Sequence, residues 1–387
     1  MRRRILPGLL LALALFAALE GGARLWRLRL PASPPTGLEW MESSARLGWR
    51  NRPGFHGTAF DTERTLDADG LFTVDAEGRK GRRLVLLLGD SRTFGNGVPV
   101  DATYGEVLEQ RLPGFAVINR AVPGYSSFQG RAALEIDAPR FRPDVVVFAF
   151  GFNDRRYVLR PEEVDGEERF RRLARRAAWT RLAGSLALVD LLGGRPSGEP
   201  GAVKAPLDLG TVAPRVSPAS FRQNLEAAAR YCAGRGIRLV LLLLNDNPVD
   251  VRELDRAVRE GRTAEAEKDL RAAVALGNTF SDAARLELAA LYERTGRPRE
   301  AAVVRISPRT FFSVTGGYPV LSQQDYRSIS FEVAARHGIQ VVDAGPVLDR
   351  HPEWYLDFCH FGGEGHRAVA ALLAAEIPRA TAPARAR

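Results

Sequence analysis

The stretch from Arg83 to Val98 constrains the fold of this chain more than any other segment. It opens with the apolar run 84–88, which is typical of a strand buried on both faces of a parallel sheet. The run ends in Gly89-Asp90-Ser91. This turn would leave a serine hydroxyl at the carboxyl end of the strand, where open α/β sheets bind their ligands. Ser91 is therefore a candidate nucleophile, provided that the chain also supplies a base and oxyanion donors.

Apolar runs and helical patterns alternate from this stretch onwards, as they do in βαβ units. The expected strands cover residues 84–88, 116–119, 145–150, 238–244 and 340–342, and the expected helices cover 103–111, 127–138, 217–233, 323–337 and 363–377. Five parallel strands with helices on both faces form a doubly wound α/β domain. We therefore predict a three-layer α/β/α domain with a flavodoxin-like five-stranded sheet.

The composition is that of a globular chain, with 45% hydrophobic and 26% charged residues among 387. The formal net charge of +9 comes almost entirely from arginine, because lysine occurs only at positions 80, 204 and 268. A compositional bias is the simpler interpretation, and a surface for anionic partners such as lipid headgroups or acidic glycans is the alternative. The basic residues are scattered and form no nucleic-acid-binding motif, so we expect no nucleic acid partner.

Residues 1–30 have the pattern of a secretory signal or a short signal anchor, since three arginines precede the apolar run Ile5–Leu19. Gly21-Gly22-Ala23 could serve as a cleavage site. Extending the span to Trp26 gives about 22 residues ending in an interfacial aromatic, which favours a retained anchor. We expect the anchor to be retained and the rest of the chain to lie across the membrane.

The remaining segments lie before, after or within the α/β domain, which is expected to cover residues 83–377. Residues 31–82 are expected to form a linker and a β-rich lead-in, and residues 378–387 a disordered tail. Two stretches are too long for ordinary crossovers: a rim insertion at 155–212 and a helical insertion at 251–303. The stretch from Tyr292 to Ala301 resembles a junction between tetratricopeptide repeat helices, although a plain helical hairpin fits equally well.

Residues with useful chemistry follow three of the expected strands or precede the last helix. Ser91 follows the first strand, Gly124 follows the second and Asn153 follows the third. The block Asp357-Phe358-Cys359-His360 precedes the last helix. Because the carboxyl ends of parallel strands meet at one edge of the sheet, we expect these residues to share one crevice.

These residue types suit acyl transfer. A serine hydroxyl is a poor nucleophile until an imidazole takes its proton, and His360 is the expected base. Asp357 can accept a hydrogen bond from the other ring nitrogen and so orient the imidazole. The backbone amides of Ser91 and Gly124 and the side-chain amide of Asn153 are suitable donors to the oxyanion of a tetrahedral intermediate. Glycine at 124 would avoid a Cβ that crowds the substrate.

The four blocks resemble those of the SGNH (GDSL-like) hydrolase family. Its four invariant roles fall on the serine, glycine, asparagine and histidine named above, with Asp357 as the third triad member. The resemblance covers roughly residues 83–377, outside the helical insertion. Residues 89–98 and Pro143-Asp144 are similar to those of membrane-anchored bacterial members from the cell envelope. The resemblance thus implies a single-pass inner-membrane protein with its catalytic domain outside the cytoplasm, or a periplasmic or secreted protein if the signal is cleaved.

The same resemblance implies a serine esterase or O-acyl hydrolase that works through an acyl-enzyme. The expected substrate is a small acyl ester, such as O-acetyl on an envelope or exported glycan. Two alternatives stay open: an O-acetyltransferase that uses the same triad, and a non-catalytic envelope scaffold that binds a protein partner through the helical insertion. Ala121 departs from the family pattern, which usually has glycine there.

Three further residues are candidates for substrate binding, namely Arg92, Arg155 and Asn245. Arg155 could steer an anionic substrate or be a solvated loop charge, and Asn245 could line the crevice or form a turn. No His/Cys/Asp cluster has the spacing of metal ligands, and no phosphate-binding glycine loop follows a strand. We therefore expect neither a metal nor a cofactor. His366, in the following helix, is expected to be structural.

Overall fold

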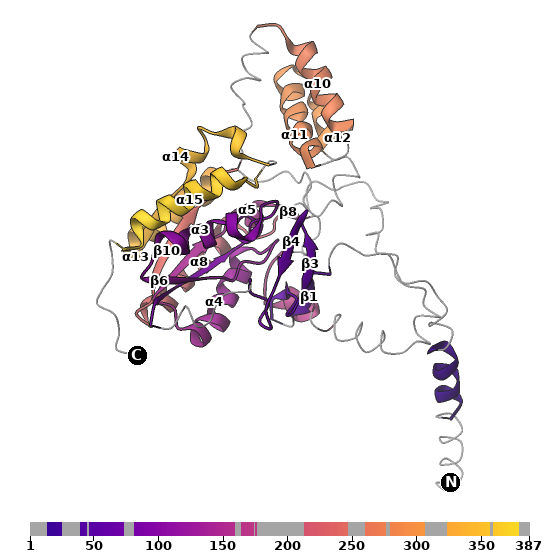
Figure 1. The fold of residues 1–387 in the computed structure, drawn as a ribbon. Coiled ribbons are helices and arrows are strands. Elements are labelled where there is room, and N and C mark those ends of the chain that lie inside the picture. Colours follow the sequence, from indigo (N-terminus) through magenta and orange to yellow (C-terminus); the bar gives the residue numbers. More distant parts are fainter. Residues whose placement is uncertain are drawn as a thin grey trace.

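A five-stranded parallel sheet forms the centre of the structure (Figure 1). The computed structural model describes residues 14–24, 39–44, 46–72, 81–158, 164–173, 175, 213–246, 260–275, 279–305, 323–356 and 359–378. In chain order the strands of the sheet are β5 (Arg83–Gly89), β6 (Phe115–Asn119), β7 (Val145–Ala149), β10 (Arg238–Leu243) and β11 (Gln340–Asp343). Across the sheet they run β11-β10-β7-β5-β6, which is the flavodoxin-like order 2-1-3-4-5 read from the opposite edge. The predicted doubly wound fold is confirmed.

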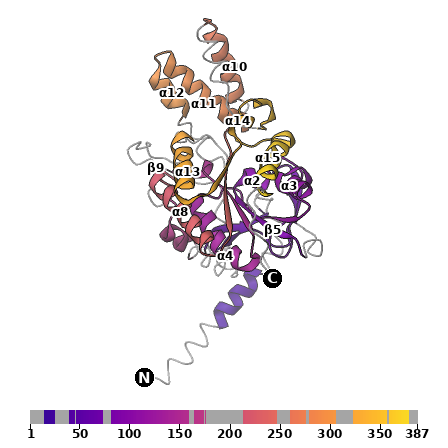
Figure 2. The ribbon, with the colours of Figure 1, turned by 90° about the vertical axis from the view of Figure 1, so that its left-hand side faces the viewer.

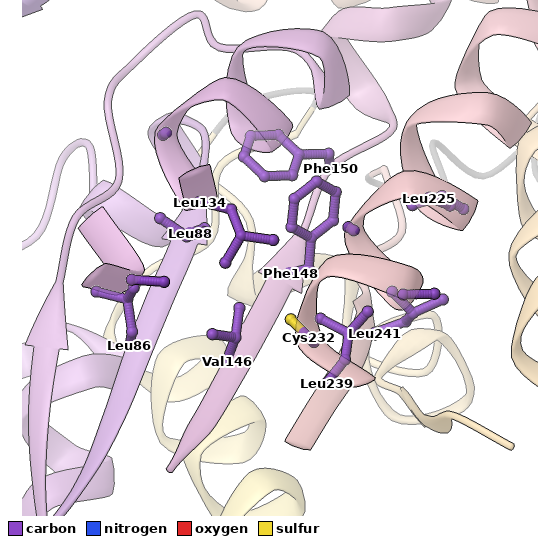
Figure 3. Close-up of a cluster of buried hydrophobic side chains, with 14 of the residues drawn as sticks. Leu86, Leu88, Leu134, Val146, Phe148, Phe150, Leu225, Cys232, Leu239 and Leu241 are labelled. Carbon is purple, nitrogen blue, oxygen red and sulfur yellow. The ribbon is translucent and has the colours of Figure 1, made fainter. Parts of the chain in front are cut away.

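The strands are continuous apolar runs because both faces of the sheet are covered. Side chains alternate between the faces along a strand, so Leu86 and Leu88 join one apolar core while Val85 and Leu87 join the other. Figure 3 shows the first core, where side chains from three strands meet those of two helices. Full burial of one such side chain contributes roughly 1.5–3 kcal/mol. The two cores together hold the carboxyl ends of the strands at one edge of the sheet.

Helices cover both faces of the sheet (Figure 2). The first core lies under α4 (Ser127–Phe141), α8 (Pro218–Ala233) and α13 (Gln323–His337), and the second lies under α3 (Tyr104–Arg111) and α15 (Gly363–Glu376). Short helical turns are α2 (Ser91–Phe94), α5 (Phe152–Arg155) and α14 (Gly345–Leu348), with 3-10 turns over Val100–Ala102 and Pro352–Trp354. The start of α8 agrees with its sequence signals, because the Ser217 hydroxyl accepts from the Ser220 amide and Pro218 follows.

Two antiparallel hairpins lie in the segment expected to be a β-rich lead-in. They are β1 (Met41–Ser44) with β2 (Gly48–Asn51), and β3 (His56–Ala59) with β4 (Thr62–Thr65). The second hairpin is joined to the loop after β5 by Arg64, whose Nη2 donates to the carbonyls of Gly95 and Val98 at 2.6 and 2.7 Å. An isolated hairpin is marginally stable in water, so such contacts with the α/β domain hold these strands in place.

The two long insertions differ in how far they are described. The antiparallel pair β8 (Tyr157–Val158) and β9 (Ala213–Pro214) joins the two ends of the rim insertion, and residues 176–212 lie outside the description. The helical insertion contains α10 (Thr263–Ala275), α11 (Thr279–Arg294) and α12 (Pro298–Arg305). These helices pack on one another around a small apolar core of their own, apart from the central sheet (Figures 1 and 2). Their likeness to tetratricopeptide repeats stays a prediction.

The amino-terminal segment is described only over residues 14–24, which are helical. Among the described residues, none of the helices has both the length and the apolar character needed to cross a membrane. The retained anchor thus stays a prediction, and so does the disordered tail, of which residues 379–387 lie outside the description.

Replacing Arg64 with methionine is expected to lower the free energy of unfolding by about 2–4 kcal/mol, because two buried carbonyls lose their donor. Arg64 is 1% exposed, and its guanidinium lies over the rings of Phe72 and Phe94. Burial lowers the pKa of Arg64 to about 10, so the side chain is still charged at neutral pH. Urea denaturation measures the change. The control Arg50→Met removes an exposed arginine paired with Glu42 and should cost less than about 1 kcal/mol; an equal loss in both variants would contradict this account.

Candidate active site

Ser91, the predicted nucleophile, lies in a tight turn at the end of β5, called here the nucleophile turn (residues 89–91). Asp90 caps α2, and its carboxylate accepts from the Arg92 amide at 2.9 Å, so Ser91 becomes the first residue of that helix. The turn needs glycine at position 89, because a Cβ there would lie 2.0 Å from the Thr93 hydroxyl oxygen. The local sequence therefore presents the Ser91 hydroxyl at the edge where the strands end.

His360 meets Ser91 across this edge. Its Nε2 lies 2.7 Å from the Ser91 Oγ, and the two residues are 7% and 8% exposed. The loop that carries His360 is closed by a hydrogen bond from the Leu356 amide to the His360 carbonyl, and α15 follows at once. A serine hydroxyl in hydrogen-bonding contact with an imidazole is the arrangement that nucleophilic catalysis requires.

The neighbours of the imidazole are described in part. Asp357 lies outside the described residues, so its predicted role in orienting the ring stays a prediction. The buried Cys359 sulfur lies 3.6 Å from His360 Nδ1. Cys359 and Cys232 are both buried, and no disulfide joins them.

His366 is a second buried histidine close to the site, and it has a structural role. Its Nδ1 accepts from the Tyr104 amide at 3.1 Å, and its ring packs against the rings of Tyr104 and Phe361. Burial, with smaller electrostatic contributions from the neighbouring His360 and Arg64, lowers the pKa of His366 to about 3. The neutral ring thus fixes the start of α3 against α15.

The loop after β6 brings Gly124 to the same edge. The Val122 amide donates to the Gly89 carbonyl at the end of β5, which ties this loop to the nucleophile turn. Gly124 has φ +82°, a conformation that other residues rarely adopt. A Cβ at Gly124 would lie 3.3 Å from the Trp49 ring. The need for glycine thus comes from the backbone conformation and from Trp49, whereas the sequence suggested crowding of the substrate.

Asn153 lies at the same edge of the sheet as Ser91, His360 and Gly124. Its side-chain amide donates to the Tyr125 carbonyl at 3.1 Å, and it lies 3.4 Å from the Asp90 carboxylate. These two contacts place the amide between the Gly124 loop and the nucleophile turn. Of the predicted catalytic residues, the structure therefore brings Ser91, His360, Gly124 and Asn153 together at one edge of the sheet.

The departure at Ala121 is accommodated by packing. Ala121 is 1% exposed and joins Leu66, Phe72 and Phe94 in an apolar cluster beneath the two loops. Its carbonyl accepts from the Asn51 side chain at 3.1 Å. The methyl group is therefore buried in apolar surroundings, and the loop that carries Gly124 is held at both ends.

Arg92 and Arg155, predicted to bind substrate, have partners inside the protein. Arg92 is 2% exposed and pairs with Asp90, and Arg155 is 3% exposed and pairs with Asp246 at 2.5 Å. Both guanidinium groups lie near the Phe152 ring. Burial alone would lower the pKa of Arg92, but Asp90 and Asp246 outweigh it and raise the pKa. The structure thus gives these arginines a buried charge network, and contact with a substrate stays a prediction.

Asn245 is likewise bound within the chain. Its Nδ2 lies 2.8 Å from both carboxylate oxygens of Asp349, and its Oδ1 accepts from Arg327 at 2.6 Å. The side chain therefore links the end of β10 to α13 and α14. Its predicted place in substrate binding is untested.

Four residues of this region were not singled out from the sequence. Asp154 is fully buried and accepts from the Ser127 amide and hydroxyl, and burial raises its pKa to about 6. Trp49, Arg215 and Asp246 contact the loops or arginines described above. The visible signals for Asp154 and Asp246 were their neighbours, because Asp154 directly follows Asn153 and Asp246 directly follows Asn245. Among the described residues, no group of three His, Cys, Asp or Glu side chains is placed to hold a metal.

Comparison with known proteins gives one family. Residues 87–275 match a family model described as the GDSL-like Lipase/Acylhydrolase family. This range includes Ser91, Gly124 and Asn153, whereas Trp49 and His360 lie outside it. No curated protein gives a significant match.

Several solved structures are similar to the chain. A lipase/acylhydrolase from Enterococcus faecalis has 16% identity and a TM-score of 0.39, over 79% of this chain and 100% of that chain. A catalytic mutant of an acetylxylan esterase from Geobacillus stearothermophilus has 13% identity and a TM-score of 0.39, over 77% and 96%. A putative lipolytic protein of the G-D-S-L family from Desulfitobacterium hafniense has 12% identity and a TM-score of 0.37, over 76% and 99%.

The buried neutral His366 makes stability depend on pH. Because the folded state lowers its pKa from 6.5 to about 3, the unfolded state binds the extra proton as the pH falls below 6.5. We expect this residue alone to remove about 2–3 kcal/mol of stability between pH 7 and pH 4.5. His366→Asn keeps an acceptor for the Tyr104 amide but does not titrate, so its unfolding free energy should fall less over this range. Denaturation curves at several pH values measure the difference, and parallel curves for the two proteins would refute it.

Proposed function

We propose that the chain, whose residues 87–275 match the model of the GDSL-like Lipase/Acylhydrolase family, is a serine esterase with Ser91 as nucleophile and His360 as general base. The observation that carries the proposal is the 2.7 Å contact between His360 Nε2 and Ser91 Oγ. The reaction would take place where the strands β5 and β7 end.

The proposed reaction has two halves. His360 takes the proton from Ser91 Oγ as that oxygen attacks the ester carbonyl, and then gives the proton to the departing alcohol oxygen. The acyl group is left on Ser91. A water molecule, deprotonated by His360, attacks the acyl-enzyme, and the carboxylic acid leaves as Ser91 recovers its proton.

The oxyanion of each tetrahedral intermediate would be bound by the amides of Ser91 and Gly124 and by Asn153. The Asn153 amide is 3.4 Å from Asp90, which is long for a hydrogen bond, so a substrate oxyanion can replace that contact. Loss of one such donor costs roughly 3–4 kcal/mol of transition-state stabilisation in other enzymes. Asp357 is proposed as the third triad member, which holds the His360 ring in orientation.

We infer a small acyl group as the preferred acyl part. Support comes from the enclosure of the reacting pair, since Ser91 and His360 are both less than a tenth exposed. An acetyl ester of an envelope or exported glycan fits the predicted membrane segment of residues 1–30. Water is the proposed acceptor, and a sugar hydroxyl in its place would make the protein an O-acetyltransferase.

The test is hydrolysis of p-nitrophenyl esters from acetyl to dodecanoyl by the full-length chain. We expect the highest kcat/KM on the shortest esters, and a loss of at least about a thousandfold in Ser91→Ala and His360→Ala. Asp357→Asn should also lose most of its activity, because the imidazole is no longer oriented.

Matched controls are Ser328→Ala and His337→Ala, which change the same residue types at exposed positions of α13 and should keep wild-type rates. Equal rates in wild type and Ser91→Ala would refute the proposed nucleophile. Acetyl transfer to an added glycan in preference to water would correct the acceptor.

A further inference from the structure

We propose that Trp49, in the amino-terminal hairpin, is a positioning residue of the oxyanion site: its indole N–H sets the direction of the Gly124 amide. The inference rests on the proposed function and adds to it a residue outside the matched range 87–275. If the inference is correct, the hairpin β1–β2 is part of the structure that supports the active site.

The argument begins with one peptide group. Trp49 Nε1 donates to the Pro123 carbonyl at 3.0 Å. That carbonyl and the Gly124 N–H belong to the same peptide, which is planar and trans, so the two groups point in opposite directions. Holding the carbonyl on the indole therefore aims the Gly124 N–H away from Trp49.

The neighbouring peptides of the loop are held in the same way. The Gly124 carbonyl accepts from Arg215 Nη1 at 2.6 Å, and the Tyr125 carbonyl accepts from Asn153 at 3.1 Å. Three consecutive carbonyls thus each have a side-chain donor from a different part of the chain. A peptide held on both sides cannot rotate without breaking a hydrogen bond, so the Gly124 N–H is preorganised before substrate arrives.

The hairpin is built to hold this indole in place. Trp49 and Asn51 are two residues apart in β2 and so lie on one face of the strand. Asn51 donates to the Ala121 carbonyl at 3.1 Å, and the Tyr125 hydroxyl donates to the Trp49 carbonyl at 2.6 Å. The strand β2 therefore contacts the loop on both sides of Gly124.

The partly buried ring also contacts two neighbouring side chains. The Arg215 guanidinium lies 5.5 Å from the ring centroid of Trp49, and the Tyr125 ring meets it edge-on at 5.7 Å. Arg215 is fixed in turn by Asp165 at 2.8 Å. Phenylalanine at position 49 would keep most of this packing while removing the N–H, which isolates the hydrogen bond.

The experiment compares Trp49→Phe with wild type on p-nitrophenyl acetate. We expect kcat to fall about tenfold or more, which corresponds to about 1.4 kcal/mol or more, while KM changes less than twofold. The affinity for a boronic acid that adds to Ser91 should fall by a similar factor, because the adduct places an oxygen in the oxyanion site. The matched control is Trp40→Phe, which changes a buried tryptophan of the same segment that packs on Phe60 and Phe94. It should keep the wild-type kcat.

A crystal structure of Trp49→Phe provides a readout that does not depend on turnover. We expect the Pro123–Gly124 peptide to be rotated away from its wild-type orientation. An unchanged kcat, or an unchanged peptide orientation, would overturn the inference. If wild type itself lacks Ser91-dependent activity, the proposed function fails, and the peptide orientation in the variant still decides whether Trp49 positions the amide.

Discussion

One hydrogen bond, between Ser91 Oγ and His360 Nε2, depends on almost every other part of the fold. It joins residues 269 positions apart in the chain, so no local structure can form it. The parallel sheet brings the serine to its edge, and α15, packed on the second apolar core, brings the histidine. An error in strand order or register would separate the two groups. The stability of the cores is therefore a condition for the chemistry.

Two arginines are buried beside this pair, and electrostatic pairing holds them in place. Arg92 and Arg155 are nearly inaccessible, and their charges would be costly to bury without Asp90 and Asp246. Such networks contribute little net stability but tolerate few alternative arrangements, because removal of one partner leaves an unpaired charge. This network links the turn that carries Ser91 to the end of β10, and it fills the space beneath the site with polar groups in fixed positions.

The sequence was sufficient to predict the sheet, its helices and the meeting of four distant blocks, because buried parallel strands and helix caps leave strong local patterns. It was less informative about Arg92 and Arg155. Their position beside predicted catalytic residues suggested substrate contact. Their shared partner Asp246 is distant in the chain, 91 positions from Arg155. Trp49 and Arg215 left no pattern at all, since both act on backbone carbonyls, which every residue has. Their role depends on where the hairpin and the end of the rim insertion dock, which is a tertiary property.

The two ends of the rim insertion are held together at its base. The pair β8–β9 joins them, and Arg215, just after β9, reaches both Asp165 and the Gly124 carbonyl. A segment anchored in this way adds little entropy cost as its length changes. Because β8 and β9 join the two ends, the residues between them can change in length and sequence while the hydrogen bond from Arg215 to the Gly124 carbonyl is kept.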